Sequence, residues 1–568
     1  MVARKKYSLL FPVGLLSAAV LAVSFSGPDS AVPGNFVDIT QAAGVRFLHK
    51  ASHTSKKYLP ETMGAGVALF DYDNDGLLDI YLVNGAPIDD PTPAGTIPKK
   101  SGPQYWNRLY HQKKDGSFED VTERAGVAAT GYGMGVAVGD YDNDGYEDLY
   151  VTQYGRNILY HNNGDGTFTD VTDIARVGGG GWSTSATWVD YDDDGKLDLI
   201  VARYLTWDFS DLWCGEHQPG HRAYCHPDLF KPITFLLYHN EDGKHFREVS
   251  KAAGLTKPGK GLGVAIADYD HDGYPDIFIA NDSMPEFVYH NKRNGTFEEV
   301  GLETGVAVDG DGSTYAGMGA DFADYNNDTW PDLVVTNLGN QKYALYSNAR
   351  DGTFSYATYT SGLAAITLRH SGWGARFFDY DNDGWKDLFV AQGHVLDTIG
   401  ISSPGLFYRE PPLLVRNTGH NFVDVSKRSG AVFGEKWAGR GLALGDIDND
   451  GKLDLVVTTN DGPAYVLRND TATANHWLSL KLVGSKSNRD GIGAAITLTT
   501  SSGKQYITVT TGGSYCSASD VRAHFGLGTE SKAKDIEIRW PSGIVQHLAN
   551  VAGDRVVTVK EEASTPHP

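Results

Sequence analysis

The chain has few positive charges for its length. Its 568 residues include 49 lysines and arginines against 71 aspartates and glutamates, which gives a formal net charge of −22. No cluster of basic residues occurs beyond the N-terminus. A surface that binds nucleic acid needs a basic stripe or patch. The shortage of basic residues therefore argues against nucleic acid as a partner.

The chain also lacks the short motifs of common catalytic sites. It contains no G-x-S-x-G, no H-E-x-x-H, no phosphate-binding glycine loop and no dinucleotide fingerprint ahead of a helix. A catalytic site built from scattered residues is still compatible with this absence. A binding module is the favoured interpretation, and an enzyme is the alternative.

Long apolar runs are missing except near the N-terminus. Basic residues at positions 4–6 precede an apolar stretch over residues 9–25, and Ser24 and Ser26 flank a cleavage point, which is the pattern of an export signal. The stretch is near the lower length limit of a membrane span, so an uncleaved anchor is the alternative. No later run reaches 18 apolar residues. Residues 1–26 are predicted to be a signal peptide, and the mature protein is predicted to be secreted, periplasmic or at the cell surface, without a further membrane span.

Only three cysteines occur. Cys214 and Cys225 lie close together in one insertion, and a disulfide is the expected state of such a pair in an exported protein. Zinc is the alternative, because Cys214, His217, His221 and Cys225 follow a C-x2-H-x3-H-x3-C spacing that suits a tetrahedral site. Cys516 has no partner and is expected to be a buried or idle thiol.

A nine-residue acidic loop is the most abundant feature, and it occurs seven times between short apolar runs. Carboxylates at its positions 1, 3, 5 and 9 are hard oxygen ligands, glycine at position 6 permits a sharp turn, and position 7 adds a carbonyl oxygen. This ligand set predicts up to seven calcium ions with a structural role. We number the loops 1 to 7 in chain order. Their ligand positions are Asp71, Asp73, Asp75 and Asp79; Asp140, Asp142, Asp144 and Asp148; Asp190, Asp192, Asp194 and Asp198; Asp268, Asp270, Asp272 and Asp276; Asp324, Asn326, Asp328 and Asp332; Asp379, Asp381, Asp383 and Asp387; and Asp446, Asp448, Asp450 and Asp454.

An EF-hand does not fit these loops. Its loop has twelve residues ending in glutamate and lies between helices. Here the flanking runs are short and rich in β-branched and aromatic residues, which predicts strands. Loop 5 departs from the pattern, because Asn326 replaces an aspartate and Thr329 replaces the glycine, so we expect its calcium affinity to be lower.

The spacing of the strands predicts a β-propeller. Each repeat of about 62 residues contains a second apolar run ending in Asn or Gln and, in most copies, a later F-x-x-V strand, which makes four strands per unit. The last repeat lacks its fourth strand, and an extra one begins at Phe36 ahead of the first loop. We therefore predict a seven-bladed β-propeller over residues 36–470, closed by its N-terminal strand.

A different pattern follows the repeats. Residues 475–562 alternate apolar and polar positions between glycine-containing turns, which predicts a small all-β domain, a sandwich-like one, before a short tail at residues 563–568. The fold class predicted for the chain is thus all-β, with a seven-bladed propeller followed by a small β-sandwich-like domain.

Three motifs in the C-terminal part carry a family resemblance. They are SNRDGIGA at residues 487–494, HFGLG at 524–528 and RWPSG at 539–543. Together they resemble the ASPIC/UnbV family, which includes cartilage acidic proteins, and the acidic repeats resemble the FG-GAP/VCBS repeats of integrin α-subunit propellers. The resemblance implies a calcium-binding extracellular propeller with a C-terminal ASPIC/UnbV domain. A related domain is encoded in enediyne biosynthetic clusters, so the resemblance also implies an accessory biosynthetic role as an alternative.

The alternation of strands predicts where a ligand binds. The acidic loops lie at one end of the strands, and four long insertions, residues 49–61, 84–106, 203–233 and 392–412, lie at the other. Repeat proteins tend to bind on the face that accepts insertions. We expect a monomer that binds an extracellular glycan or protein there, with a polysaccharide-modifying lyase or dehydratase as the alternative, while the calcium face stays free. The predicted contact residues are His49, Glu61, Trp106, His370, His394 and Arg440.

Overall fold

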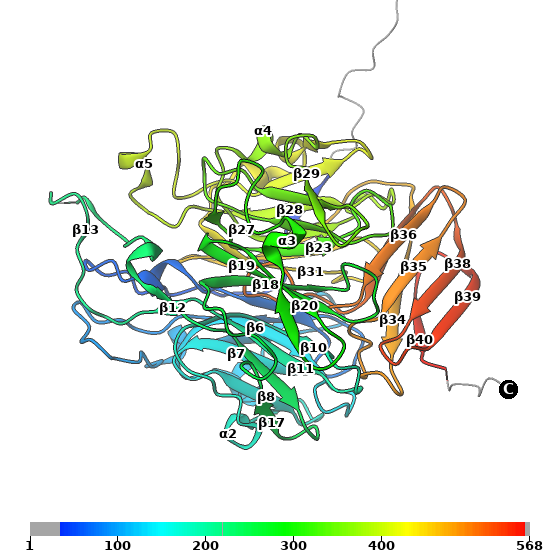
Figure 1. Cartoon of the computed structure of the whole chain (residues 1–568), viewed down its shortest axis with the longest axis horizontal. Coiled ribbons are helices and arrows are strands. Elements are labelled where there is room, and N and C mark those ends of the chain that lie inside the picture. The colour runs from blue at the N-terminus through cyan, green and yellow to red at the C-terminus, as the bar shows by residue number, and fades with distance from the viewer. Residues whose placement is uncertain (1–33, 219, 563–568) are drawn as a thin grey trace, which may run out of the picture. The chain divides into compact units, whose positions relative to one another are not determined.

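The computed structural model describes residues 34–218 and 220–562. Strands dominate (Figure 1). Seven antiparallel sheets follow one another along the chain, each built on four strands, and the sheet of β18 also includes the short β22. In six of them the four strands pair in sequence order, and the seventh takes its fourth strand from the N-terminus. The all-β prediction is confirmed, and the predicted signal peptide at 1–26 and the tail at 563–568 lie outside the described residues.

The strands occupy equivalent places in each sheet. The first strands are β2 (Val67–Phe70), β6 (Tyr132–Gly139), β10 (Ser183–Val189), β18 (Gly261–Ala267), β23 (Ala320–Ala323), β27 (Gly372–Phe378) and β31 (Gly439–Gly445). The second strands are β3 (Asp79–Leu82), β7 (Asp148–Tyr154), β11 (Asp198–Arg203), β19 (Asp276–Met284), β24 (Asp332–Val335), β28 (Asp387–Gln392) and β32 (Asp454–Thr459). The third strands are β4 (Arg108–Gln112), β8 (Ile158–Asn162), β16 (Leu236–Asn240), β20 (Phe287–Asn291), β25 (Ala344–Asn348), β29 (Leu413–Asn417) and β33 (Tyr465–Asn469). The fourth strands are β5 (Phe118–Asp120), β9 (Phe168–Asp170), β17 (Phe246–Glu248), β21 (Phe297–Glu299), β26 (Phe354–Tyr356), β30 (Phe422–Asp424) and β1 (Phe36–Asp38).

Short elements fill the connections. The helices of one turn are α1 (Thr122–Ala125), α2 (Thr172–Ala175), α3 (Gly301–Thr304), α4 (Leu363–Thr367) and α5 (Ile399–Ser402). The short extra strands are β12 (Leu205–Thr206), β13 (Cys214–Gly215), β14 (Arg222–Ala223), β15 (Lys231–Pro232) and β22 (Tyr315–Ala316). No helix in the described part of the chain has the length and apolar character to cross a membrane.

The N-terminal strand closes the series of sheets. β1 pairs antiparallel with β33, so that Phe36 lies opposite Asn469, although more than 400 residues separate them. The missing fourth strand of the last repeat predicts this pairing. The first strands of neighbouring sheets contact one another in chain order, and β31 contacts β2.

Small residues permit the first strands to approach one another. A Cβ atom on Gly319 would lie 2.0 Å from the carbonyl oxygen of Trp373 in β27, and one on Gly66 would lie 2.2 Å from that of Cys516. Both distances are too short for a side chain, so glycine is required where the backbones converge. The G-x-G runs ahead of the acidic loops therefore have a packing role.

The C-terminal part forms two further sheets. β34 (His476–Val483) pairs with β37 (Ala523–Gly528) and, in parallel, with β40 (Arg555–Lys560). The second sheet contains β35 (Ala495–Thr499), β36 (Lys504–Thr508), β38 (Lys532–Arg539) and β39 (Val545–Ala552). Both sheets contribute to one apolar core, for example through Leu480, Ile496 and Phe525, so burial of these side chains holds the two together.

One segment of this C-terminal part, residues 510–520, lies among the first strands of the seven sheets, and we call it the plug. Its Ala518 exchanges backbone hydrogen bonds of 2.9 and 3.1 Å with Val67 and Leu69 of β2, and Ser514 exchanges two with Ala320 of β23. It also hydrogen-bonds to β6, β10, β27 and β31. The fully buried Tyr515 packs edge-on against Trp373. The centre of the ring of first strands is therefore filled by protein.

Candidate metal centre and binding face

The acidic loops share one backbone geometry. In all seven, the backbone N–H of position 6 donates to the carboxylate of position 1, over 2.7 to 3.1 Å. Position 6 has a positive φ in every copy, which glycine adopts without strain. Loop 5 keeps this geometry with Thr329 at φ 71°. A β-branched residue is strained there, so the sequence change costs stability without changing the turn.

Position 9 fastens each loop to its own sheet. Its carboxylate accepts the backbone N–H of the Asn or Gln that ends the third strand, at 2.7 to 2.8 Å in all seven copies. In loop 1 the other oxygen of Asp79 accepts the N–H of Tyr72 at 3.2 Å. The position-9 aspartate is therefore both a candidate ligand and a structural link between strands.

The same Asn or Gln also links each loop to the preceding one. Its side-chain amide donates to the carbonyl of position 2 in the preceding loop, over 2.7 to 3.0 Å, and Gln112 reaches Ile447 so that the set of seven contacts closes on itself. The repeated terminal amide was visible in the sequence, but its bridging role was not predicted.

A second set of contacts joins position 4 of one loop to position 6 of the next, and we call it the asparagine belt. The amides of Asn74, Asn143, Asn327, Asn382 and Asn449 donate to glycine carbonyls at 2.8 to 3.1 Å. All seven position-4 residues have φ between 55° and 61°, a region that asparagine tolerates. The belt is interrupted at loops 3 and 4, where position 4 is Asp193 and His271, and His271 stacks on Trp330 instead.

Histidines support the first four loops. His111, His161, His239 and His290 each place Nδ1 3.1 to 3.4 Å from the position-9 carboxylate and 3.3 to 3.7 Å from that of position 3. Hydrogen bonding to the position-9 carboxylate raises the pKa of each histidine. An imidazole placed in this way orients a ligating carboxylate from outside, as around many metal sites.

The carboxylates of the loops fit a cation. Burial raises the pKa of Asp79, Asp148 and Asp198 to about 7. Position-3 oxygens of Asp73, Asp142 and Asp192 are buried without a hydrogen-bond partner. Converging carboxylates that are desolvated and incompletely satisfied are suited to a counter-ion, and an all-oxygen set of this kind suits calcium.

The expectation that the calcium face stays free is wrong, because the C-terminal part covers it. The carboxylate of Asp490 accepts the N–H of Asp140 at 2.8 Å, and Nε2 of His524 lies 2.8 Å from Oδ1 of Asn382. Arg522 donates to Oδ1 of Asn449 at 2.8 Å. The belt asparagines use their Nδ2 groups within the ring, so their oxygens remain available to accept from this domain.

The four insertions lie away from these contacts. In Figure 1, α5 and β13, which belong to two of the insertions, are at the opposite side of the molecule from strands β34–β40. The insertion at 49–61 is joined to each of the other three. Ser55 hydrogen-bonds Asp90, Lys56 pairs with Asp211 at 2.7 Å, and Lys57 pairs with Asp397 at 2.5 Å.

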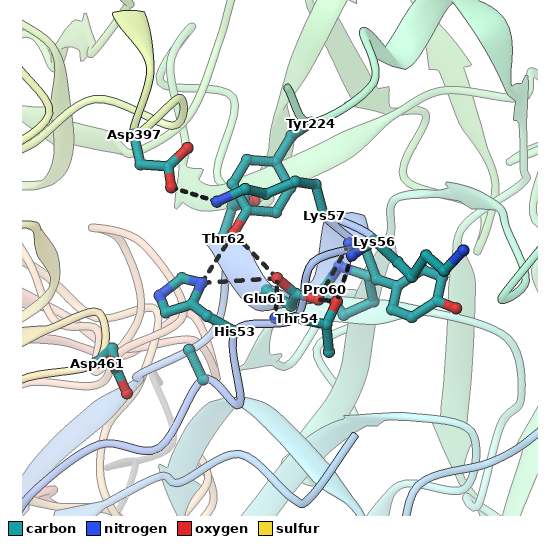
Figure 2. A network of polar contacts seen from close by, with 12 residues as sticks. His53, Thr54, Lys56, Lys57, Pro60, Glu61, Thr62, Tyr224, Asp397 and Asp461 are labelled. Atoms are coloured by element: carbon teal, nitrogen blue, oxygen red, sulfur yellow. Dashed lines mark hydrogen bonds and ion pairs between the residues drawn. The ribbon is translucent and has the colours of Figure 1, made fainter. Parts of the chain in front are cut away.

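Glu61 is the centre of this arrangement (Figure 2). Its fully buried carboxylate accepts from the Thr54 N–H and hydroxyl, at 3.1 and 2.5 Å, and from the Tyr58 N–H at 3.1 Å. The hydroxyl of Tyr224 reaches it at 3.0 Å and also lies 2.8 Å from Nδ1 of His53. Glu61 therefore orders two insertions from within, and the partly exposed His53 is the member of this network that a ligand can reach.

The other predicted contact residues are mostly buried. Burial lowers the pKa of His49 to about 3 and that of His394 to about 4, which keeps both neutral. The guanidinium of Arg440 is fully buried and donates to the carbonyls of Thr62, Gly439 and His394. These contacts join Arg440 to His394 and to Thr62, the residue after Glu61, in one group that supports the face.

The two remaining predicted residues lie in separate surroundings. His370 pairs with Glu410 at 2.8 Å, and the ring of Trp106 makes a cation–π contact with the Arg108 guanidinium. Both are half-buried. Sequence reasoning missed His53, Lys56 and Lys57, because they lie in unique insertions where no repeated pattern marks them.

The aromatic residues of the insertions mainly pack inward. Trp207 packs against Phe209 and Trp182 within one apolar cluster. Phe407 and Trp213 are the exposed exceptions, at 57% and 44% of their surface. Cys214 and Cys225 form the predicted disulfide, which places Tyr224 beside Glu61 and leaves no thiolate for zinc.

Comparison with known families agrees with this architecture. A family model described as ASPIC and UnbV matches residues 484–566. A model described as FG-GAP-like repeat matches residues 94–151, 140–201, 268–335 and 324–390, and one described as FG-GAP repeat matches 438–467. The chain thus contains FG-GAP repeats and a C-terminal ASPIC/UnbV domain. We call residues 475–562 the ASPIC/UnbV domain from here on.

Curated relatives of this FG-GAP and ASPIC/UnbV protein include cartilage acidic protein 1. The Mus musculus protein is 27% identical over 307 residues, which are 52% of this chain and 44% of the relative. The Homo sapiens protein is 26% identical over 319 residues, which are 56% of this chain and 46% of the relative. The match thus spans less than half the length of either relative.

Solved structures give weaker matches. An Agrocybe aegerita lectin that recognises non-reducing terminal N-acetylglucosamine has a TM-score of 0.37 and 18% identity, over 64% of this chain and 81% of its own. A rhamnogalacturonan lyase of Bacillus licheniformis has a TM-score of 0.35 and 13% identity, over 72% of each chain.

Proposed function

We propose that this protein is an exported, calcium-stabilised binding module. In this proposal the seven sheets are the blades of one propeller, closed by β1, and the ASPIC/UnbV domain is a β-sandwich that caps the calcium face. The insertion face binds an extracellular glycan or protein. Export is supported by the disulfide, which persists in oxidising compartments.

One observation carries the proposal. The four long insertions are joined into a single surface by the segment 49–61, and this surface lies away from the ASPIC/UnbV domain. Such an arrangement is typical of repeat proteins that bind a partner on their insertion face. The buried network around Glu61 gives that surface a fixed shape, which reduces the entropy lost on binding.

Calcium is assigned to the opposite face on the basis of the ligand chemistry. The aspartates at positions 1, 3, 5 and 9 would hold the ion, and when bound it would neutralise carboxylates that otherwise repel one another. Three kinds of group hydrogen-bond or orient these carboxylates. They are the backbone N–H of position 6, the backbone N–H of the Asn or Gln that ends the third strand, and the histidine side chains beside loops 1 to 4. Calcium in this role stiffens the ring and takes no part in ligand contact.

A binding screen tests the proposed function. The protein is presented to a glycan array and to immobilised matrix proteins, with calcium and after chelation. Phe407→Ala and Trp213→Ala should reduce binding to any hit, whereas Val545→Ala, an exposed apolar residue of the ASPIC/UnbV domain, should not. Loss of binding with Val545→Ala alone would assign recognition to that domain, and turnover of a polysaccharide in the same assay would favour the enzyme alternative.

A further inference from the structure

The seven acidic loops differ at one position of the third strand. The residue before the terminal Asn or Gln faces the loop, and it is histidine in the first four copies. The same position is Ser347 in loop 5, Arg416 in loop 6 and Arg468 in loop 7. A permanent positive charge at this position changes what the loop can bind.

Arg416 contacts two ligand positions of its own loop. Its Nε and Nη2 atoms lie 3.1 and 3.0 Å from Oδ2 of Asp381, and Nη2 lies 2.6 Å from Oδ2 of Asp383. These aspartates are positions 3 and 5. The side chain of Asp381 is 1% exposed and that of Arg416 is 15% exposed, so solvent screens the pair weakly. A guanidinium remains charged at any pH of interest and forms strong hydrogen bonds with carboxylates.

A second cation lies on the other side of the same loop. Lys386 occupies position 8, is buried, and donates to the carbonyl of His524 at 3.4 Å. Burial lowers the pKa of Lys386, and the nearby carboxylates of Asp379 and Asp387, which are positions 1 and 9, oppose that shift. Arg416, with Lys386 nearby, places positive charge among the carboxylates where a calcium ion would otherwise supply it.

Loop 7 shows that an arginine at this position does not always act in this way. Arg468 turns to Asp470 outside the loop, with Nε 2.7 Å and Nη2 2.9 Å from its oxygens. The ligand carboxylates of loop 7 thus accept no hydrogen bond from the Arg468 guanidinium, and Asp450 pairs with Lys452 instead. Loops 6 and 7 form a natural matched pair, with the same residue at the same strand position and different contacts.

We propose that loop 6 contains its own cation, the Arg416 guanidinium assisted by Lys386, and does not take up calcium under conditions that fill loops 1 to 4. This inference rests on the proposed calcium role of the other loops. The second oxygen of Asp381, buried and without a hydrogen-bond partner, is the group that calcium would use if it displaced the arginine.

Loop 6 contacts the ASPIC/UnbV domain directly, so its independence of calcium would affect how that domain is held. Its Asp381 carbonyl accepts the Asn475 amide at 2.9 Å, and its Asn382 contacts His524 and Gly528, all in the ASPIC/UnbV domain. A loop that needs no metal keeps the domain attached when calcium is lost elsewhere.

Three variants test the proposal, each compared with the wild-type chain. Arg416→His installs the residue of loops 1 to 4 and should add one bound calcium per chain. Arg468→His makes the same change in loop 7 and should add none. His161→Arg brings the arginine into loop 2 and should remove one. Bound metal is counted by equilibrium dialysis with atomic emission, and terbium luminescence gives an independent count of ions.

The outcomes separate this proposal from the broader one. If Arg416→His binds as much calcium as wild type, the proposal is overturned and the calcium role of the remaining loops stands. If Arg416→His does not fold, His161→Arg decides, and an unchanged count there overturns the proposal. If wild type binds no calcium at all, both the inference and the calcium part of the proposed function are overturned.

Discussion

The two faces of the propeller are ordered in different ways. On the calcium face, the same few contacts recur in every repeat, such as the position-6 N–H on the position-1 carboxylate and the third-strand amide on the preceding loop. On the insertion face, order comes from contacts used once, namely the Glu61 network, the disulfide and the ion pairs of Lys56 and Lys57.

Under the proposed function, this difference separates the contacts that stabilise the fold from those that shape the binding surface. Repeated contacts let each sheet hold its neighbours, so changes to one loop are shared around the ring. Contacts that occur only once fix the shape of the insertion face, and they can change without disturbing the repeated loops. Selection for a new ligand can therefore act on one face alone.

Removal of calcium should produce the largest effect, confined at first to the calcium face. Each site filled at a hundred times its Kd contributes about 2.7 kcal/mol. Loss of several such sites should lower the melting temperature by on the order of 10 °C or more. Differential scanning calorimetry in EDTA measures this shift, and hydrogen exchange should show faster exchange in the acidic loops before the insertions. An unchanged melt with metal verified absent would contradict the calcium role.

The calcium face should also make stability depend on pH, with a sign opposite to the usual one for aspartate. Burial raises the pKa of Asp79, Asp148 and Asp198 to about 7 and that of Asp190 to about 8. Because the folded metal-free protein holds these protons more tightly than the unfolded chain, their contribution to stability is present at low pH and is lost as pH rises through 7 to 8.

Calcium must displace those protons, so the gain in melting temperature on adding calcium should increase from pH 5.5 to pH 8. Paired melts with EDTA or calcium at each pH measure the gain. A gain that shrinks with rising pH would show that these carboxylates are not the ligands.

Glu61→Ala should disrupt the insertion face alone. The change leaves the buried N–H groups of Thr54 and Tyr58 without an acceptor and removes one partner of the Tyr224 hydroxyl, at a cost of about 3 kcal/mol or more. We expect faster hydrogen exchange in residues 49–61 and 203–233, weaker ligand binding and an unchanged calcium count. Glu119→Ala, on an exposed glutamate of β5, is the control. Loss of bound calcium in Glu61→Ala would mean that the two faces are coupled.

The smallest effect is expected from repairing one of the two interruptions of the asparagine belt. Asp193→Asn supplies an amide donor at an interruption of the belt, where the equivalent acceptor in the next loop is the Gly273 carbonyl. The change also removes a carboxylate that is repelled by Asp192 and Asp272. A gain of about 0.5–1 kcal/mol in unfolding free energy is expected. Asn143→Asp makes the reverse change and should lose a similar amount. Chemical denaturation measures both, and equal stabilities would show that the belt is incidental.

The sequence predicted the repeated half of this comparison well. The sequence revealed the seven acidic loops, the strand at Phe36 and the terminal Asn of the third strands. These features could be predicted because residues that recur at the same place in every repeat mark positions that the fold requires. The Cys214–Cys225 disulfide and the ASPIC/UnbV resemblance were likewise predicted. The position-4 asparagine also recurs, but the partner of its amide lies in the next repeat and becomes visible only in three dimensions.

The unrepeated half could not be predicted in the same way. Glu61, His394 and Arg440 were expected to face a ligand, yet they are buried, because a polar residue in an insertion looks the same in sequence whether it supports a surface or forms it. The contact between the ASPIC/UnbV domain and the loops was also missed. This contact depends on how the two sheets of the domain pack against the ring, and no local sequence pattern encodes that packing.

The plug makes the order of synthesis a physical constraint on this fold. Strand β1 is synthesised before the seven sheets but cannot pair until its partner β33 has been made. The first strands of the ring hydrogen-bond to residues 510–520, which are synthesised after all seven sheets. During synthesis the edge of the first completed sheet and the polar backbone at the centre are exposed to other chains. We expect maturation to be slow and to end with the last hundred residues, so that a chain truncated before them is prone to aggregate even though each repeat is intact.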